Sequence, residues 1–302
     1  MKGEVTLNVR IIPRLDIKGP NLVKGIQFDG YRALGKAEEF SYLYYREGCD
    51  ELIFYDTVAS LYQRNNLLEF VKAVSQNIFV PLTVAGGLRS VDDIRNVLRA
   101  GADKVAINTA AVENPKLLSD ASKAFGSQCI VSSIEAKRKS NGTYEAWVDY
   151  GRQPTGVDVI EWAQKVVEFG AGEILLTSID CEGTGQGYDL ELTAAISEHV
   201  PIPVIASGGS GSKEDLYRVI EIGKADAVAV ASVFHYYYAR PLDRTYSASD
   251  ENGLRMGKQL DQGNIEFLNT QYGGFEEARF NKIAVPEAKA YLNKSGVECR
   301  LI

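Results

Sequence analysis

Short apolar runs alternate with amphipathic segments along most of the chain. Eight runs are nearly continuous in apolar residues and rich in β-branched ones, which is typical of strands buried on both faces. The segments between them repeat their apolar positions at helical spacing. The expected strands are 9–16, 52–56, 80–84, 104–107, 129–135, 174–178, 203–207 and 227–231. The expected helices are 36–47, 61–74, 91–100, 114–124, 157–169, 190–199, 212–223 and 285–294.

This alternation predicts the fold class. Strands that alternate strictly with helices form a parallel sheet covered by helices, and eight repetitions predict a closed (β/α)8 barrel, the TIM barrel. A chain of 302 residues, 45% of them hydrophobic, matches one such barrel with an insertion. We therefore expect a single domain over residues 1–302.

The chain also repeats itself. Segment 81–111 returns as 203–234, and segment 48–60 returns as 170–184, at a lag of 122 residues. Only two copies are present, and each contains strand, helix, strand and helix, whereas a solenoid needs at least three units. The repeat therefore indicates two half-barrels, about 9–125 and 128–235, related by a pseudo-twofold axis.

One segment breaks the alternation. Residues 236–281 are rich in Tyr, Gly and Asp, where the connection to the last helix normally takes a few residues. One interpretation is a solvated decoration or an oligomer contact. The other is a lid or a partner-binding loop, because loops after barrel strands build the active face. The helix at about 285–295 then closes the barrel.

Composition excludes several classes of function. The net charge of −7 without any Lys/Arg run disfavours nucleic acid as a partner. Four scattered cysteines indicate reduced thiols, and no apolar run is long enough for a signal peptide or a membrane span, so we expect a cytoplasmic protein that does not bind membranes. Two histidines and no GxGxxG after the first strand predict neither a metal nor another cofactor.

Small residues follow four of the expected strands at matching places in the two halves. Backbone N–H groups at such turns, beside helix N-termini, bind phosphate without cationic side chains. A single glycine pair is usually only a turn, but two pairs in register, each with a small-residue turn about 22 residues later, predict a ligand with two phosphates. The residues are Gly87, Asn108 and Thr109 in the first half and Ser207, Gly209, Ala231 and Ser232 in the second.

Two acidic residues end equivalent strands. Asp16 ends the first strand and Glu135 the fifth, so the pseudo-twofold axis places them on opposite sides of the barrel mouth, where barrel enzymes keep catalytic groups. The catalytic interpretation is general acid and base catalysis on a sugar or amine skeleton. The alternative is that each acid pairs with the lysine two residues on, because an unpaired buried charge is costly. A second symmetric pair, expected to support the substrate or to fix loops, is Asp56 and Asp180.

Charged residues also stand at the N-terminal ends of four expected strands. Two are positive and two are negative, so they would form a self-neutralising ring at the floor of the barrel. Charge at that face usually serves stability. The functional alternative is a gate. The four residues are Arg10, Glu51, Lys104 and Glu173.

Long motifs over residues 10–234 and 285–301 resemble the HisF family, the cyclase subunit of imidazole glycerol phosphate synthase. They are RIIPRLDIKGPNLVKG, DELIFYD, GADKVAINTAAVENP, GAGEILLTSID, IASGGSG and ASVFH. In that family ammonia from a partner glutaminase enters through the barrel floor and reacts at the top with a bisphosphorylated ribulosyl precursor. The resemblance therefore implies a lyase of histidine biosynthesis that forms imidazole glycerol phosphate and aminoimidazole carboxamide ribotide (AICAR), as a heterodimer with a HisH-like glutaminase.

The resemblance also implies roles for individual residues. Asp16 and Glu135 take the places of two catalytic aspartates, and the four floor residues take that of the ammonia gate. Asp103, just before the fourth strand, lies where the family contacts its glutaminase. One phosphate falls to Gly87, Asn108 and Thr109, and the other to Gly183, Gly209, Ala231 and Ser232.

Departures from the family gather at the mouth of the barrel. Glu135 is one methylene longer than the aspartate of the family, a shift of roughly an ångström that can cost about a hundredfold in a tuned site. The floor matches better than the mouth, as expected if ammonia delivery is kept while the acceptor changes. The other departures are Arg14 for a small residue, Ala85 for a glycine, Glu182 for an aspartate, the Gly19-Pro20 loop and the 236–281 insertion.

Three functions stay open at this point. The first is the histidine-pathway cyclase itself. The second is a HisF-like subunit that passes ammonia to a different acceptor, such as a surface-polysaccharide sugar that becomes an amide or acetamidino derivative. The third is a non-catalytic conduit that binds and activates the glutaminase. A sugar-phosphate isomerase on the same duplicated barrel is disfavoured because it needs no charged floor ring.

Overall fold

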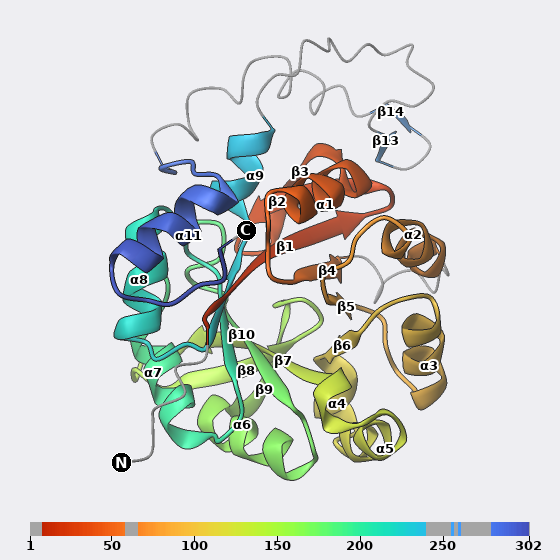
Figure 1. Cartoon of the computed structure of the whole chain (residues 1–302). Helices are drawn as coiled ribbons and strands as arrows, with labels where there is room; N and C mark the ends of the chain where they lie inside the picture. Colours follow the sequence, from red (N-terminus) through yellow and green to blue (C-terminus); the bar gives the residue numbers. More distant parts are fainter. Residues whose placement is uncertain (1–7, 58–65, 240–254, 257–258, 261–278, 302) are drawn as a thin grey trace, which may run out of the picture.

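A computed structural model describes residues 8–57, 66–239, 255–256, 259–260 and 279–301. Within these residues, eight parallel strands close into a barrel, so the predicted TIM-barrel fold is confirmed (Figure 1). Each expected strand starts within two residues of an observed one. In spatial order the strands are β1 (Arg10–Lys18), β4 (Leu52–Asp56), β5 (Leu82–Ala85), β6 (Lys104–Ile107), β7 (Ile130–Arg138), β10 (Glu173–Ser178), β11 (Val204–Ser207) and β12 (Ala227–Val230).

Helices surround the barrel (Figure 1). Those that the sequence predicts are α1 (Ala37–Arg46), α2 (Asn66–Ser75), α3 (Val91–Arg99), α5 (Lys116–Phe125), α6 (Val159–Glu168), α7 (Leu190–His199), α8 (Lys213–Glu221) and α11 (Val285–Lys294). Three short elements were not predicted, namely α4 (Thr109–Glu113), α9 (Ser232–Tyr238) and the 3-10 turn η1 (Ser127–Cys129). None of the described helices is long and apolar enough to cross a membrane.

Two hairpins that the sequence analysis took for connections extend the mouth of the barrel. β1 continues into an antiparallel hairpin of β2 (Asn21–Ile26) and β3 (Asp29–Lys36). β7 continues into an equivalent hairpin of β8 (Tyr144–Val148) and β9 (Gln153–Asp158). Each hairpin follows the first strand of its half, so the internal repeat includes them. Their strands lie outside the barrel wall and lack the continuous apolar runs that mark buried parallel strands.

The expected insertion is only partly described. Its first residues belong to α9, and β13 (Arg255–Met256) pairs with β14 (Gln259–Leu260). The lid and decoration interpretations otherwise fall on residues outside those described.

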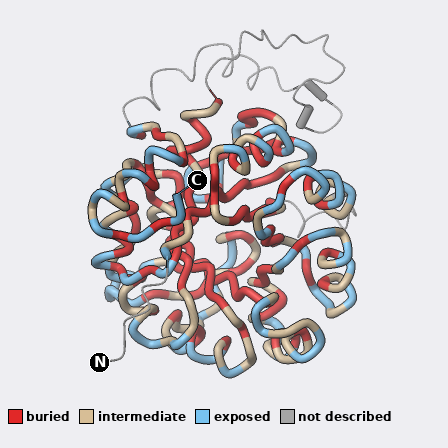
Figure 2. The backbone as a smooth tube through the Cα atoms, in the orientation of Figure 1, coloured by how far each residue is buried: buried red, intermediate tan, exposed pale blue. Residues whose placement is uncertain are grey.

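Side chains of the barrel strands alternate between the lumen and the surrounding helices. In β1, Ile11 and Leu15 belong to the core between strands and helices, whereas Ile12 belongs to a second core inside the lumen. Figure 2 shows the buried backbone at the centre and exposed backbone on the outer helices. The same alternation directs Arg10, Arg14 and Asp16 into the lumen with Ile12.

Candidate active site

Each half of the barrel presents a glycine pair directly after a strand. Both glycines of the pairs 86–87 and 208–209 have φ between 70° and 113°, a region that side chains avoid. A Cβ on Gly86 would lie 2.7 Å from the carbonyl oxygen of Asp56, and one on Gly208 would lie 2.9 Å from that of Ser178. Glycine is therefore required in both turns by the close approach of the neighbouring strand end.

The helix after each glycine pair is capped in the same way. The Ser90 hydroxyl accepts the N–H of Asp93 at the start of α3. The Ser212 hydroxyl accepts the N–H of Asp215 at the start of α8, and the Asp215 carboxylate accepts the Ser212 N–H in return. These caps fix the chain direction just after the turns. The sequence repeat thus encodes two copies of one local structure.

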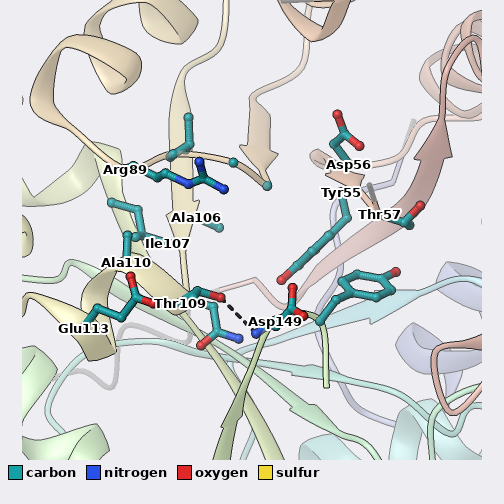
Figure 3. A pocket seen from close by; sticks show the side chains of 15 residues that line it. Tyr55, Asp56, Thr57, Arg89, Ala106, Ile107, Thr109, Ala110, Glu113 and Asp149 are labelled. Carbon is teal, nitrogen blue, oxygen red and sulfur yellow. Dashed lines mark hydrogen bonds between the residues drawn. The ribbon is translucent and has the colours of Figure 1, made fainter. Parts of the chain in front are cut away.

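The first-half turns line an open pocket of about 70 Å³. Gly87, Asn108 and Thr109, all three predicted for the first phosphate, contribute to its wall. The Thr109 hydroxyl accepts the backbone N–H of Asp149 at 3.0 Å (Figure 3). Asn108 Nδ2 donates to the Trp147 carbonyl at 3.2 Å. The β8–β9 hairpin therefore holds the turn. Other side chains on this wall are Asp56, Arg89 and Glu113 (Figure 3).

The second-half turns line a smaller pocket of about 20 Å³. Its wall contains every residue predicted for the second phosphate: Gly183, Ser207, Gly209, Ala231 and Ser232. Four buried charged side chains complete it: Arg14, Asp16, Lys24 and Glu182. Among the described residues, none lines both pockets. The two phosphate turns thus open into separate cavities.

The four buried charges of the second pocket, which we call the mouth chain, alternate in sign. Arg14 Nε lies 3.1 Å from Asp16 Oδ1, and Lys24 Nζ lies 3.6 Å from Asp16 Oδ2. Lys24 also pairs with Glu182, whose second oxygen accepts the Phe28 backbone N–H at 3.1 Å. Asp16 is thus paired, but with Arg14 and Lys24 and not with the lysine two residues on that the alternative interpretation proposed. Each member is at most 4% exposed.

The Arg14 guanidinium crosses the lumen. Its Nη1 donates to Thr177 Oγ1 at 3.0 Å and to Ser207 Oγ at 3.1 Å, on the distant strands β10 and β11. Its central carbon lies 4.6 Å from the centre of the Tyr55 ring, a cation–π contact. Among the described residues, nothing accepts a hydrogen bond from its buried Nη2. Arg10, Arg14 and Asp16 are an even number of residues apart in one strand, so their side chains share a face. That spacing is the signal in the sequence for this placement of Arg14.

Glu135 sits among aromatic side chains. Its Oε1 accepts the Tyr55 hydroxyl at 2.7 Å and its Oε2 accepts the Gly151 N–H at 2.6 Å. Tyr150 packs 4.9 Å from the Tyr55 ring and 4.4 Å from the Phe28 ring. Tyr55 and Tyr150 line the first pocket. Arg14, which lines the second pocket, packs on the rings of Tyr55 and Phe28. These three rings therefore lie between the two pockets, and we call Phe28, Tyr55 and Tyr150 the aromatic partition. Sequence reasoning missed it, since two of its members come from the hairpins.

The two predicted acids have opposite electrostatic environments. Burial alone would raise the pKa of Asp16, but the charges of Arg14 and Lys24 outweigh it and hold that pKa below its ordinary value. Burial raises the pKa of Glu135 to about 7, and the Tyr55 hydrogen bond and the Arg14 charge offset only part of the effect. Near neutral pH, Asp16 is therefore ionised, whereas Glu135 is present in both its protonated and its ionised form.

The predicted floor residues form a closed ring. Arg10 lies 2.7 Å from Glu51 and also pairs with Glu173. Lys104 lies 3.1 Å from Glu51 and 2.9 Å from Glu173. Every cation contacts both acids, and the two cations keep 24% and 17% of their side chains exposed. We call this group the floor ring.

Aspartates beside the floor ring hold the strand starts. Asp103 is exposed, and its Oδ2 accepts the Leu82 N–H at 2.9 Å. Asp226 accepts the Val204 N–H at 2.8 Å in the equivalent place of the other half. At the mouth, Asp180 accepts the N–H of Arg138, the last residue of β7, at 2.8 Å.

Comparisons with known proteins identify a family and relatives of this chain. The profile of the family described as histidine biosynthesis protein matches residues 10–239. A protein of Legionella pneumophila named imidazole glycerol phosphate synthase subunit HisF is 61% identical over 208 residues, which cover 69% of this chain and 98% of the relative. A protein of Dehalococcoides mccartyi with the same name is 51% identical over 230 residues, covering 76% of this chain and 90% of the relative.

Proposed function

The chain belongs to the histidine biosynthesis protein family, and from that membership we propose that it is the cyclase subunit of an imidazole glycerol phosphate synthase. It uses ammonia to convert a bisphosphorylated ribulosyl precursor into imidazole glycerol phosphate and AICAR. The similar proteins of Legionella and Dehalococcoides carry the name of this subunit.

One observation carries the proposal. Two buried acids with opposite pKa shifts share the mouth of a barrel that also presents two phosphate turns. Pairs of acids whose environments separate their pKa values are typical of general acid and base catalysis. A ligand with a phosphate at each turn would place its middle between Asp16 and Glu135. That arrangement matches a substrate that reacts between its two phosphates.

The chemistry follows from the two protonation states. Asp16, held ionised by Arg14 and Lys24, accepts a proton from the nitrogen as ammonia adds to the ribulosyl carbonyl. Glu135, protonated below about pH 7, donates a proton to the carbonyl oxygen, which becomes a hydroxyl. Asp16 then gives up the proton that it took from nitrogen, the hydroxyl leaves as water, and the carbon–nitrogen double bond forms as Glu135 takes back a proton from nitrogen. Tyr55 keeps the Glu135 carboxyl in place through its hydrogen bond. The new nitrogen attacks the amidine carbon to close the imidazole ring, and the bond from that carbon to the AICAR amine breaks as the amine takes up the proton that the attacking nitrogen loses.

Ammonia reaches this site through the barrel in our proposal. The floor ring covers the lumen at the N-terminal ends of the strands, and apolar side chains such as Ile12 and Leu175 fill the next layer. A neutral molecule crosses such a layer more readily than ammonium, because burying a charge there is costly. The ring acts as a gate that opens when an ion pair parts.

A glutaminase related to HisH supplies the ammonia and binds the floor. Asp103 is exposed beside Lys104 of the ring, so it can reach a partner at that face. Charge reversal by Asp103→Lys should weaken glutaminase binding in a titration and leave turnover with added ammonium unchanged. Unchanged binding would place the interface elsewhere.

The direct test is turnover with purified protein, ammonium at alkaline pH and the ribulosyl precursor, followed as loss of the precursor's absorbance. Turnover that Asp16→Asn abolishes supports the cyclase. Absence of turnover, with glutaminase binding intact, would contradict it and favour another acceptor.

A second candidate function rests on the aromatic partition. It separates the two phosphate pockets, so a ligand that spans both requires Tyr150 to move. A shorter acceptor, such as a sugar with one phosphate or none that takes up ammonia as an amide or acetamidino group, would need no such movement. The same ammonium assay with such sugars in place of the precursor separates the two functions.

A further inference from the structure

The Arg14 side chain has a hydrogen-bonding edge that the protein uses only in part. In a guanidinium, Nε–H and one N–H of Nη2 point the same way, and together they can bind two oxygens of one anion. Asp16 Oδ1 occupies the Nε–H at 3.1 Å. Nη2 lies on that same edge and, among the described residues, has no partner. A buried charged donor without an acceptor is costly, which points to an acceptor that a ligand supplies.

Lys24, the other cation of the mouth chain, has a different set of contacts. It contacts both Asp16 and Glu182, so two of its three donors face carboxylates of the mouth chain. Arg14 can bind an anion without breaking an existing ion pair. Its Nη1, bound to Thr177 and Ser207, fixes the plane of the guanidinium across the lumen. Nη2 is therefore held in one direction before any ligand arrives.

The lining of the second pocket indicates which anion this is. Arg14 shares that wall with Gly209, Ala231 and Ser232, where the backbone of the second half turns beside α8 and α9. We propose that Arg14 binds an oxygen of the substrate's second phosphate through Nη2, which makes it a specificity-determining residue for that phosphate. The assignment deepens the proposed function and takes from it only that the ligand is phosphorylated.

The alternative is that Arg14 only neutralises Asp16. Inorganic phosphate binding, measured by titration calorimetry at constant ionic strength, separates the two because it needs no reaction. Asp16→Asn removes the negative charge of Asp16. If Arg14 served only to neutralise that charge, its further removal in this background would not change phosphate binding. We expect Arg14→Met/Asp16→Asn to bind phosphate at least about tenfold more weakly than Asp16→Asn, the loss of one hydrogen bond to a charged group.

The matched control removes a guanidinium that lines neither pocket. Arg95→Gln in the Asp16→Asn background, at an exposed ion pair on α3, should leave phosphate binding unchanged. If the Arg14→Met double variant does not fold, Arg14→Lys/Asp16→Asn replaces it, since a shorter ammonium loses the Nη2 donor while keeping the charge. Equal phosphate affinity with and without Arg14 would overturn the assignment, as would no saturable binding by Asp16→Asn. Either result leaves the turnover test of the cyclase unaffected.

Discussion

The barrel carries two groups of four charged side chains, one at each end of its lumen. Both contain two cations and two acids that alternate in sign. In the floor ring every cation contacts both acids, and its cations are partly exposed. In the mouth chain three contacts leave the ends unjoined, and every member is buried. The same composition therefore gives a closed group at one end and an open one at the other.

This difference separates two tasks. A closed ring satisfies its own charges, so it needs no ligand and suits a gate that parts and closes again. An open buried chain leaves one donor, Arg14 Nη2, without a partner among the described residues, and a ligand can complete it. In our proposal the mouth gains that contact from the substrate, whereas the floor ring needs none.

The largest effect is expected from removal of Asp16, the acid at the centre of the mouth chain. Asp16→Asn should lower turnover by about 10³-fold with ammonia or with glutamine as nitrogen source, because general base catalysis contributes that order. Asp180→Asn is the matched control, since it also follows a barrel strand but bonds to a backbone N–H at the end of β7. A loss of similar size in both variants would contradict a special role for Asp16.

Glu135 offers a pH test of the same site. Its folded pKa of about 7 lies above the ordinary glutamate value, so the protonated acid is lost as pH rises through 7. Turnover per un-ionised ammonia should therefore fall above pH 7. Glu135→Gln should lower turnover about a hundredfold, and the fall in turnover above pH 7 should disappear in this variant. If the fall persisted in Glu135→Gln, another group would be responsible for it.

The floor ring predicts a loss of stability rather than of chemistry. Lys104→Met leaves Glu51 and Glu173 facing one remaining cation, Arg10. Because the ring is partly exposed, we expect a loss of about 1–3 kcal/mol in the free energy of unfolding, below the value for fully buried pairs. Urea unfolding measures it. Arg95→Met, which removes an exposed ion pair with Asp92, should change stability by less than about 0.5 kcal/mol. Equal losses would contradict a cooperative ring.

The smallest expected effect concerns the aromatic partition. Tyr150→Ser removes the ring that lies against both Phe28 and Tyr55. If the substrate spans both pockets, the KM for the ribulosyl precursor should fall by up to about tenfold, because a closed state no longer competes with binding. An unchanged or higher KM would favour the shorter acceptor.

Much of this architecture could be predicted from the sequence. The floor ring was found because apolar runs mark the strand starts, and Arg10 and Lys104 stand directly at them. The two turns proposed for phosphate were predicted because a glycine pair, followed by a small-residue turn, recurs after 122 residues. Both features depend on local sequence, which sets strand limits and turns.

The mouth could be predicted only in part. The positions of Asp16 and Glu135 could be predicted from the ends of their strands. Which side chains pair with each acid depends on the register of strands across the barrel, which the sequence does not give. Arg14 reaches Thr177, which is 163 residues away. Tyr150 sits in a turn at φ 57°, two residues after β8. Contacts between distant elements set the pKa values, so the sequence alone did not predict them.

Two variants, one from each end of the lumen, test most directly whether delivery at the floor is separate from chemistry at the mouth. Turnover of each is measured with two nitrogen sources, ammonium alone and glutamine with the partner glutaminase. Lys104→Met should lose turnover with glutamine while keeping turnover with ammonium, because a ring that stays open no longer retains the ammonia that the glutaminase releases. Asp16→Asn should lose both. If Lys104→Met lost both activities equally, or Asp16→Asn retained turnover with ammonium, the separation of delivery at the floor from chemistry at the mouth would be wrong.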